Sequence, residues 1–545
     1  MISQDNTFLQ EFERRTTLIE KLLDIGTALS STKSLSTLLN LILTKSREIT
    51  NSDAGSVYLV DHSQDKPRLI FKIAQNVSIP DLSFREFFLP LTDRSLAGYV
   101  ALTGDSLNIP DAYSLPSDKS FQLDRSFDES VCYRTCSVLV LPMQNHEGRT
   151  LGVLQLINLK FQPDTILTVD NTLDNTQPFS EQEERILRSL ASQAAVSIER
   201  NQLEKDIEHL FASFVQASVQ VIEQRDPCTF GHSERVATLT VRLAEEINHV
   251  HTGVLRPISF GDHQLQEIRY AALLHDFGKI GVPEAILHKS KKLYPEQMEA
   301  IRHRFTLAQR TLEQEALQAK YQLLLQFSNQ HLTDSLACPH CQQVEQIEAN
   351  LEQSINRLHQ LWNVVIEANE PHVIAQQPCF QLADLEPLTY RDLDGQSKPL
   401  ISAEEMAQLQ VKRGTLTAEE RLVMESHVNQ TYRFLQQIPW TGDLKNVPKI
   451  AYGHHERLDG TGYPQSLEQP TIPIQAQMMA IADVYDALTA GDRPYKSGIP
   501  TVIALKILRQ EAASHKINAN LLEIFEQRQV YQAIGHSLDV VMKLA

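Results

Sequence analysis

At 545 residues the chain is too long for one hydrophobic core, so about two to four domains are expected. Its 68 acidic residues outnumber 50 Lys and Arg residues, and the net charge of −18 argues against the broad basic surface that binds a nucleic-acid polymer non-specifically. Six cysteines, no charged-then-apolar leader and no apolar run of about 18 residues predict a cytoplasmic protein without direct membrane insertion.

The first predicted domain spans residues 17–203 and follows an N-terminal extension, residues 1–16. From Leu18 to Arg47, apolar residues recur at helical spacing and predict a pair of amphipathic helices. Runs of apolar and β-branched residues then predict strands, listed here in chain order: 54–60, 68–73, 137–142 and 150–159. A helical segment follows, so the order of elements predicts an α+β domain.

Two segments that begin with glycine, Gly98 to Gly104 and Gly152 to Asn158, extend this pattern. With the predicted strands they resemble a GAF domain, a sensor module for small ligands. The resemblance implies an antiparallel sheet flanked by helices, and an unknown small ligand bound by this domain.

A connecting helix is expected at residues 181–223, where it overlaps the end of the first domain. Apolar residues keep a helical period through Leu190, Leu203 and Leu210 to about Glu223. In two chains such a helix would form a parallel coiled coil that passes a twist or register change to the second half, so a homodimer is expected. The alternative is a helix that packs only on its own domain.

Histidines and aspartates mark the second predicted domain, residues 224–545. They occur as His275-Asp276 before Gly278-Lys279, as His454-His455 before a turn that ends in Gly462-Tyr463-Pro464, and as Asp483. Hydrolysis of a phosphodiester needs an activated water and neutralised phosphate charge, which two metal ions provide together. Imidazole and carboxylate ligands suit iron, manganese or zinc.

In this order the motifs resemble those of HD-GYP phosphodiesterases, whose usual substrate is cyclic di-GMP. The resemblance implies an all-α HD-type hydrolase domain that converts cyclic di-GMP to linear pGpG, to GMP or to both. It implies a metal-ligand set that consists of His232, His275, Asp276, His454, His455 and Asp483. Asp276 would bridge two metal ions and so be catalytic. Members with three metals carry a Glu one helical turn before the first His, and the segment from Asp226 to Gly231 lacks it, which favours two.

The same resemblance assigns the substrate contacts. Lys279 would hold a substrate phosphate, and Tyr463 with Pro464 would shape the guanine-binding loop. Arg493 and Lys496 would contact a base or a phosphate. For Asp486, three residues after Asp483, two roles stay open: a direct contact in the site, or a hydrogen bond that supports a ligand.

A further ligand motif of the family, Lys-x-x-x-Leu-Thr-x-Glu-Glu followed by His, is split in this chain. Its first copy begins near Ile286 and places Arg304 in the ligand register, with His303 one position early. A second copy at residues 412–420 places His427 in that register. The split predicts an insertion at about residues 296–412 and makes His427 the expected ligand.

The insertion has the pattern of an antiparallel helical hairpin with Cys338 and Cys341 at its tip. Three interpretations of this CxxC pair stay open: a bare turn, a redox pair, or half of a structural zinc site shared between two chains. The βαβ setting of a thioredoxin-like pair is missing. Residues 370–400 are expected to form an irregular connection.

The sequence thus favours a phosphodiesterase regulated by its sensor domain. One alternative is a catalytically silent nucleotide-binding or scaffold protein, which the intact ligand positions disfavour. Another is an HD phosphohydrolase with a different nucleotide substrate, which the Gly-Tyr-Pro loop disfavours.

Overall fold

The computed structural model describes residues 20, 23–29, 31–32, 34–62, 66–80, 85–226, 230–327, 339–371, 382–392, 394–491 and 498–538. Two compact units divide the chain, Met1–Ala212 and Ser213–Ala545. None of the helices within the described residues combines the length and the hydrophobicity that a bilayer span requires.

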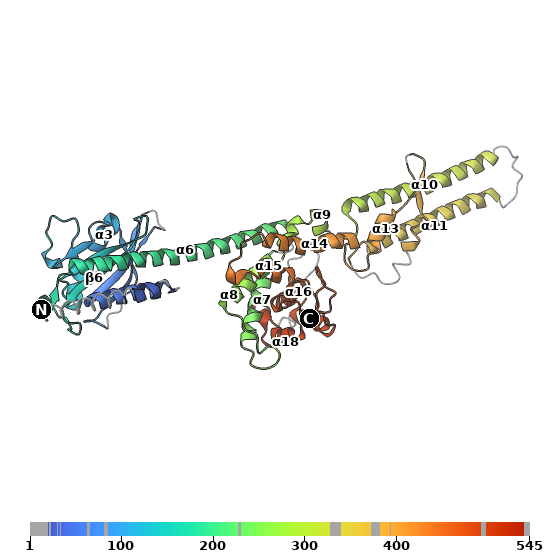
Figure 1. The fold of residues 1–545 in the computed structure, drawn as a ribbon. Coiled ribbons are helices and arrows are strands. Elements are labelled where there is room, and N and C mark those ends of the chain that lie inside the picture. The colour runs from blue at the N-terminus through green and yellow to red at the C-terminus, as the bar shows by residue number, and fades with distance from the viewer. Residues whose placement is uncertain are drawn as a thin grey trace. The chain divides into compact units, whose positions relative to one another are not determined.

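An antiparallel sheet forms the centre of the first unit (Figure 1). Its strands have the order β3-β2-β1-β6-β5-β4, and β7 pairs with β6. Their bounds are β1 (Ser52–Asp61), β2 (Arg68–Asn76), β3 (Phe87–Pro90), β4 (Leu107–Ile109), β5 (Val138–Gln144), β6 (Thr150–Lys160) and β7 (Thr176–Gln177). The predicted antiparallel sheet with flanking helices is therefore confirmed.

Helices pack on the two faces of this sheet because residues along each strand alternate between the faces. On one face, Val57 of β1 and Leu154 of β6 share a core with the apolar sides of α2 and α6. On the other face, Val153 packs with Val100 of α3. The helices of this unit are α2 (Leu35–Thr50), α3 (Leu96–Thr103), η1 (Ala112–Ser114), α4 (Ser126–Val131), α5 (Thr172–Asn175) and α6 (Glu181–Arg225), the last of which crosses the unit boundary.

The second unit is mainly helical, as predicted. Its core around the candidate site is built from α7 (His232–Asn248), α8 (Asp262–Leu274), η3 (Phe277–Gly281), α9 (Glu284–Leu287), α14 (Ala418–Leu435), η4 (Gly442–Leu444), α15 (Val447–Tyr452), α16 (Ile474–Thr489), α17 (Thr501–Ala513), α18 (Ala519–Gln527) and η5 (Val530–Ile534). Between α9 and α14 lie α10 (Pro295–Phe327), α11 (Pro339–Ala368), β8 (Thr389–Arg391), β9 (Ser397–Pro399) and α13 (Ala403–Leu409).

The segment between α9 and α14 forms a hydrophobic core of its own. The helices α10 and α11 contact each other along this segment (Figure 1), and Phe305 and Trp362 pack with ring centroids 5.2 Å apart. Ile301 and Leu400 belong to the same buried cluster. The irregular connection expected at residues 370–400 was wrong in part: β8 and β9 form an antiparallel hairpin there, closed by backbone hydrogen bonds from Asp392 to Gln396 and from Gly395 to Asp392.

Candidate metal centre

Five helices deliver the predicted ligands to one buried place. His232 begins α7, His275 caps the C-terminus of α8, and His427 lies within α14. His454 and His455 follow Gly453, the residue that caps α15, and Asp483 lies in α16. The sequence separation is large, yet the rings of His275 and His454 lie 4.8 Å apart and those of His427 and His455 lie 5.4 Å apart.

Backbone carbonyls fix the tautomers of three of these histidines. The Nδ1 atoms of His275, His427 and His454 lie 2.6–2.7 Å from the carbonyl oxygens three residues earlier. A carbonyl only accepts, so each Nδ1 donates its hydrogen and each Nε2 keeps a lone pair. These three Nε2 atoms are buried without a hydrogen-bond partner among the described residues. Such an arrangement is unfavourable in a purely structural core and typical of metal ligands.

Asp276 lies between the histidines. Its Oδ1 is 3.3 Å from His427 Nε2, and its Oδ2 is 3.4 Å from His275 Nε2 and 3.8 Å from His232 Nε2. A lone pair and a carboxylate oxygen that face each other at such distances repel, and a cation between them removes the repulsion. The donor set therefore fits divalent metal ions.

Two groups of donors are separated within the site. The donor atoms of His427, His454 and His455 lie within 4.8 Å of one another, and so do those of His232, His275 and Asp276. Asp483 joins the groups, because its carboxylate is 3.2 Å from His232 Nε2 and 3.8 Å from His455 Nδ1. The donors thus form two groups, with Asp483 between them.

Burial and neighbouring charges set the protonation of the ligands. Burial lowers the pKa of His455 to about 4 and that of His454 well below its ordinary value, so both rings are neutral near pH 7. Burial also lowers the pKa of His232, but hydrogen bonds to Asp483 and Asp486 outweigh it and raise the value to about 9. Burial opposes ionisation of Asp276, yet the charged Lys279 beside it holds its pKa well below the usual range.

Asp486 contacts a ligand rather than the centre of the site. Its Oδ2 lies 2.7 Å from His232 Nδ1. Arg235 binds both carboxylate oxygens, with Nε 2.6 Å from Oδ1 and Nη2 3.0 Å from Oδ2. Of the two roles left open for Asp486, this geometry is that of a carboxylate that orients a ligand.

Lys279 supplies a cation beside Asp276. Its Nζ lies 2.8 Å from Asp276 Oδ2 and 3.6 Å from Asp226 Oδ2. Burial lowers the pKa of Lys279, but these two carboxylates outweigh burial and raise it, so the ammonium group stays charged. An ammonium group at this place is suited to a phosphate oxygen.

The Gly-Tyr-Pro loop is tied to the histidine doublet. The Tyr463 amide donates to the His455 carbonyl at 3.2 Å, and the two rings lie 4.8 Å apart. Buried Glu456 accepts the amides of Gln465 and Leu467, which fixes the loop around Pro464. The half-buried Tyr463 thus lines the site together with a ligand.

Other predicted residues lie elsewhere. Arg493, Lys496 and Cys338 fall outside the described residues, and Cys341 is exposed near the start of α11. His303 is exposed on α10, where its Nε2 lies 3.4 Å from Glu299. Of the two histidines that the split motif offered, the structure brings only His427 into the site.

Several supporting residues were not assigned from the sequence: Arg235, Asp226, Glu456 and Thr431. The Thr431 hydroxyl accepts from the Gly278 amide at 2.8 Å and donates to the His275 carbonyl at 3.0 Å. Thr431 lies one helical turn after His427. This spacing can be read from the sequence, and it places both residues on the same face of α14.

Comparisons with known proteins match three regions. A GAF domain model matches residues 34–198, and HD domain models match residues 229–354 and 402–521. In Vibrio cholerae, a cyclic di-GMP phosphodiesterase is 37% identical over 119 residues, which are 21% of this chain and 24% of that protein. A 3'3'-cGAMP-specific phosphodiesterase of the same organism is 32% identical over 123 residues, 22% of this chain and 28% of that protein. A cyclic di-GMP phosphodiesterase of Pseudomonas aeruginosa is 44% identical over 87 residues, 16% of this chain and 20% of that protein.

The chain therefore spans between about a fifth and just over a quarter of the length of these relatives. Among solved structures, a GAF domain/HD domain protein from Geobacter sulfurreducens is 20% identical and covers 33% of this chain and 98% of its own, with a TM-score of 0.23. The GAF domain of an Acinetobacter phosphoenolpyruvate-protein phosphotransferase is also 20% identical and covers 34% of this chain and 94% of its own, with a TM-score of 0.25.

Proposed function

Because the chain carries a GAF domain followed by HD domain sequence in two segments, we infer that it is a metal-dependent phosphodiesterase that its GAF domain regulates. Its proposed substrate is cyclic di-GMP, and the proposed products are linear pGpG, GMP or both. One observation carries the proposal: three buried Nε2 lone pairs, two of which face Asp276, have no hydrogen-bond partner among the described residues.

The two groups of donor residues indicate which side chains would bind each metal ion. His427, His454 and His455 would hold one divalent ion, and His232 and His275 would hold the other, with Asp276 and Asp483 between them. When bound, two such ions of iron, manganese or zinc activate a water molecule and neutralise phosphate charge. Lys279 would bind a phosphate oxygen of the substrate, because its ammonium group is charged and lies beside Asp276.

Tyr463 supports a substrate with a nucleobase. Its ring lies beside His455 at the edge of the donor set, where it can stack on a base whose phosphate reaches Lys279 and the metals. Relatives named for cyclic di-GMP and for 3'3'-cGAMP make the second dinucleotide the alternative substrate. A catalytically silent scaffold is disfavoured, because buried imidazoles without hydrogen-bond partners lower the stability of the fold. A scaffold would gain nothing from them.

We also propose that the active form is a homodimer joined along α6. Six large apolar side chains of this helix are 45–70% exposed, and their spacing of 7, 4, 3, 4 and 7 residues is that of a coiled-coil stripe. They are Val196, Leu203, Ile207, Leu210, Phe214 and Val221. The same stripe on a second copy is the occupant that this heptad pattern fits, because positions a and d of identical helices interdigitate.

The test measures bound metals in the purified full chain and follows its turnover of cyclic di-GMP and of 3'3'-cGAMP, with chromatography of the products. Asp276→Ala is expected to lose at least one metal ion and nearly all turnover, because it removes the carboxylate between both ligand groups. Asp262→Ala, at the exposed start of α8, is the matched control and is expected to keep both. Wild-type protein that binds no metal, or an Asp276→Ala variant with full turnover, would overturn the proposal.

A further inference from the structure

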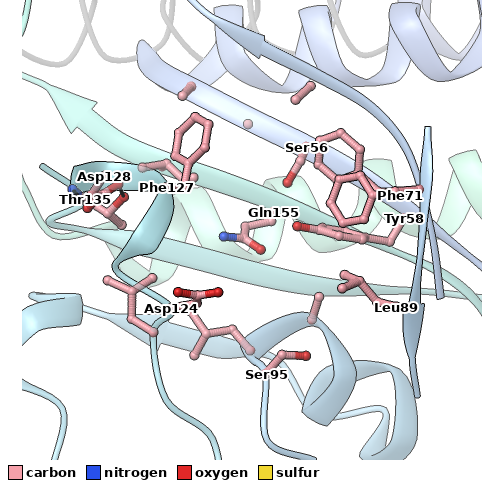
Figure 2. Close-up of a pocket in the computed structure, with 18 of the residues that line it drawn as sticks. Ser56, Tyr58, Phe71, Leu89, Ser95, Asp124, Phe127, Asp128, Thr135 and Gln155 are labelled. Atoms are coloured by element: carbon pink, nitrogen blue, oxygen red, sulfur yellow. Dashed lines mark hydrogen bonds between the residues drawn. The ribbon is translucent and has the colours of Figure 1, made fainter. Parts of the chain in front are cut away.

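A cavity of about 460 Å³ opens on the face of the GAF sheet that α3 covers (Figure 2). Strands β1, β2 and β6 form its floor, and the start of α3 and residues 122–128 form its sides. Its volume falls within the range of about 300–1,000 Å³ that small-molecule sites occupy. It is separate from the candidate metal centre, which lies in the other unit.

Aromatic side chains line one end of the cavity. The rings of Tyr58 and Phe71 meet edge to face at 5.4 Å, and Phe71 stacks on Phe87 at 4.6 Å. Leu89 and Ile157 add further apolar surface. Such walls favour a flat, apolar or aromatic ligand, because rings bury much surface and stack with defined geometry.

One polar side chain interrupts this apolar floor. Gln155 is only 8% exposed, and no described residue forms a hydrogen bond with its side-chain amide. Figure 2 shows that amide directed into the cavity, close to Ser56. Ser56 is the cross-strand partner of Gln155. The Gln155 amide faces a largely apolar cavity without a protein partner, and a ligand that offers a donor beside an acceptor pairs with it.

The charges of the lining disfavour a phosphate ester. Among the described residues that line the cavity, Arg94 is the only Lys, Arg or His, and it is exposed. Two carboxylates, Asp124 and Asp128, also line the cavity. Asp128 accepts hydrogen bonds from Tyr113 and from both the amide and the hydroxyl of Thr135, so its carboxylate oxygens are already engaged. An anionic ligand would therefore enter a low-dielectric cavity without a buried cation to pair with.

We propose that this cavity binds an uncharged, flat heteroaromatic molecule whose edge carries a donor next to an acceptor, the chemistry of a free purine base, and that Gln155 recognises that edge. The amide of Gln155 pairs with the donor and acceptor, while the rings of Tyr58 and Phe71 contact the flat faces or edges of the ligand. This assignment concerns binding alone, so it does not depend on hydrolysis of cyclic di-GMP by the HD domain.

The test is equilibrium dialysis of the full chain with hypoxanthine, with cyclic GMP and with indole. Hypoxanthine carries the required edge, cyclic GMP adds a phosphate, and indole is flat but has no acceptor at its edge. Gln155→Met keeps the shape of the side chain and removes the amide. Gln122→Met is the matched control, because Gln122 also lines the cavity but donates its amide hydrogen to the Pro116 carbonyl at 3.3 Å.

We expect hypoxanthine to bind the wild type, to lose at least about tenfold in affinity with Gln155→Met, and to change less than about twofold with Gln122→Met. A loss of hypoxanthine affinity in Gln155→Met but not in Gln122→Met would assign binding to this cavity rather than to the candidate metal centre. The melting temperature of Gln155→Met should stay equal or rise, because an unpaired amide is removed. If that variant does not fold, Gln155→Leu replaces it and should weaken binding as well, because it also removes the amide.

Four results would overturn the proposal. Hypoxanthine that does not bind, or that binds Gln155→Met as well as the wild type, would exclude recognition by this amide. Cyclic GMP that binds more tightly than hypoxanthine in a Gln155-dependent way would make the ligand an anionic nucleotide. Indole that binds as tightly as hypoxanthine would show that the apolar walls alone determine affinity.

Discussion

Gly278 determines how closely η3 approaches α14. A Cβ atom added at this residue would lie 1.9 Å from the His427 carbonyl oxygen and 2.6 Å from the Thr431 amide nitrogen. Both are backbone atoms within α14 and cannot rotate away. Since Cβ contacts under 3.0 Å essentially never occur, Gly278→Ala must move η3 and α14 apart by about 1 Å.

That shift acts directly on the metal centre. His275 and Asp276 directly precede η3, whereas His427 belongs to α14, so the shift separates proposed ligands that lie on either side of Asp276. It also stretches the hydrogen bonds that Thr431 forms with Gly278 and His275. A misplacement of about 1 Å costs on the order of 100-fold in rate. Overpacking of this kind costs about 1–3 kcal/mol in the free energy of unfolding.

The assay measures kcat for cyclic di-GMP, metal content and thermal unfolding of Gly278→Ala. Gly281→Ala is the matched control in the same element, because its Cβ would meet Gln430 Oε1 at 1.6 Å, the far end of a flexible side chain that can turn aside. We expect the control to remain within a few-fold of wild-type turnover. Wild-type turnover and metal content in Gly278→Ala would refute the argument that this close approach sets the ligand geometry.

Three further experiments test separate parts of the assignment. His427→Ala should lose metal and turnover and His303→Ala should keep both, as metal analysis will show; the opposite result would make the first motif copy the ligand motif. Asp486→Asn should lower metal affinity or turnover about 10–100-fold in metal titrations, because it weakens the support of a ligand, and an unchanged affinity would contradict that role. Leu203→Asp with Leu210→Asp should give monomers in analytical ultracentrifugation without a lower melting temperature, since these side chains are 55% and 70% exposed; a persistent dimer would exclude the α6 stripe as the interface.

Long periodic or β-branched runs made most of the fold predictable. The predicted strands correspond to β1, β2, β5 and β6, which form the centre of the sheet. The short strands β3, β4 and β7 were not predicted, because two to four residues are too few for a periodic pattern. The hairpin of β8 and β9 was missed for the same reason, since each strand has three residues.

In the metal centre, residue type and order were enough to propose the ligands but not the residues that position them. Counting from Leu416 selected His427, because the second motif copy is uninterrupted up to that histidine. Arg235 is 251 residues from Asp486, and Thr431 is 153 residues from Gly278. Contacts between residues so far apart in the sequence depend on how helices pack against one another. The periodicity within one helix does not encode that packing.

The contacts at the base of the insertion explain how a motif can be split without moving its ligand. Lys289, from the first copy, places Nζ 2.7 Å from Glu420 of the second copy, and Tyr294 donates to the same carboxylate at 2.6 Å. The Lys289 side chain is 1% exposed and that of Glu420 is 14% exposed, so breaking this pair would cost about 3–5 kcal/mol. Arg304, which falls in the ligand register of the first copy, instead pairs with Glu405 inside the insertion. The first copy therefore joins the insertion to the start of α14, and the second copy alone positions a ligand in the site.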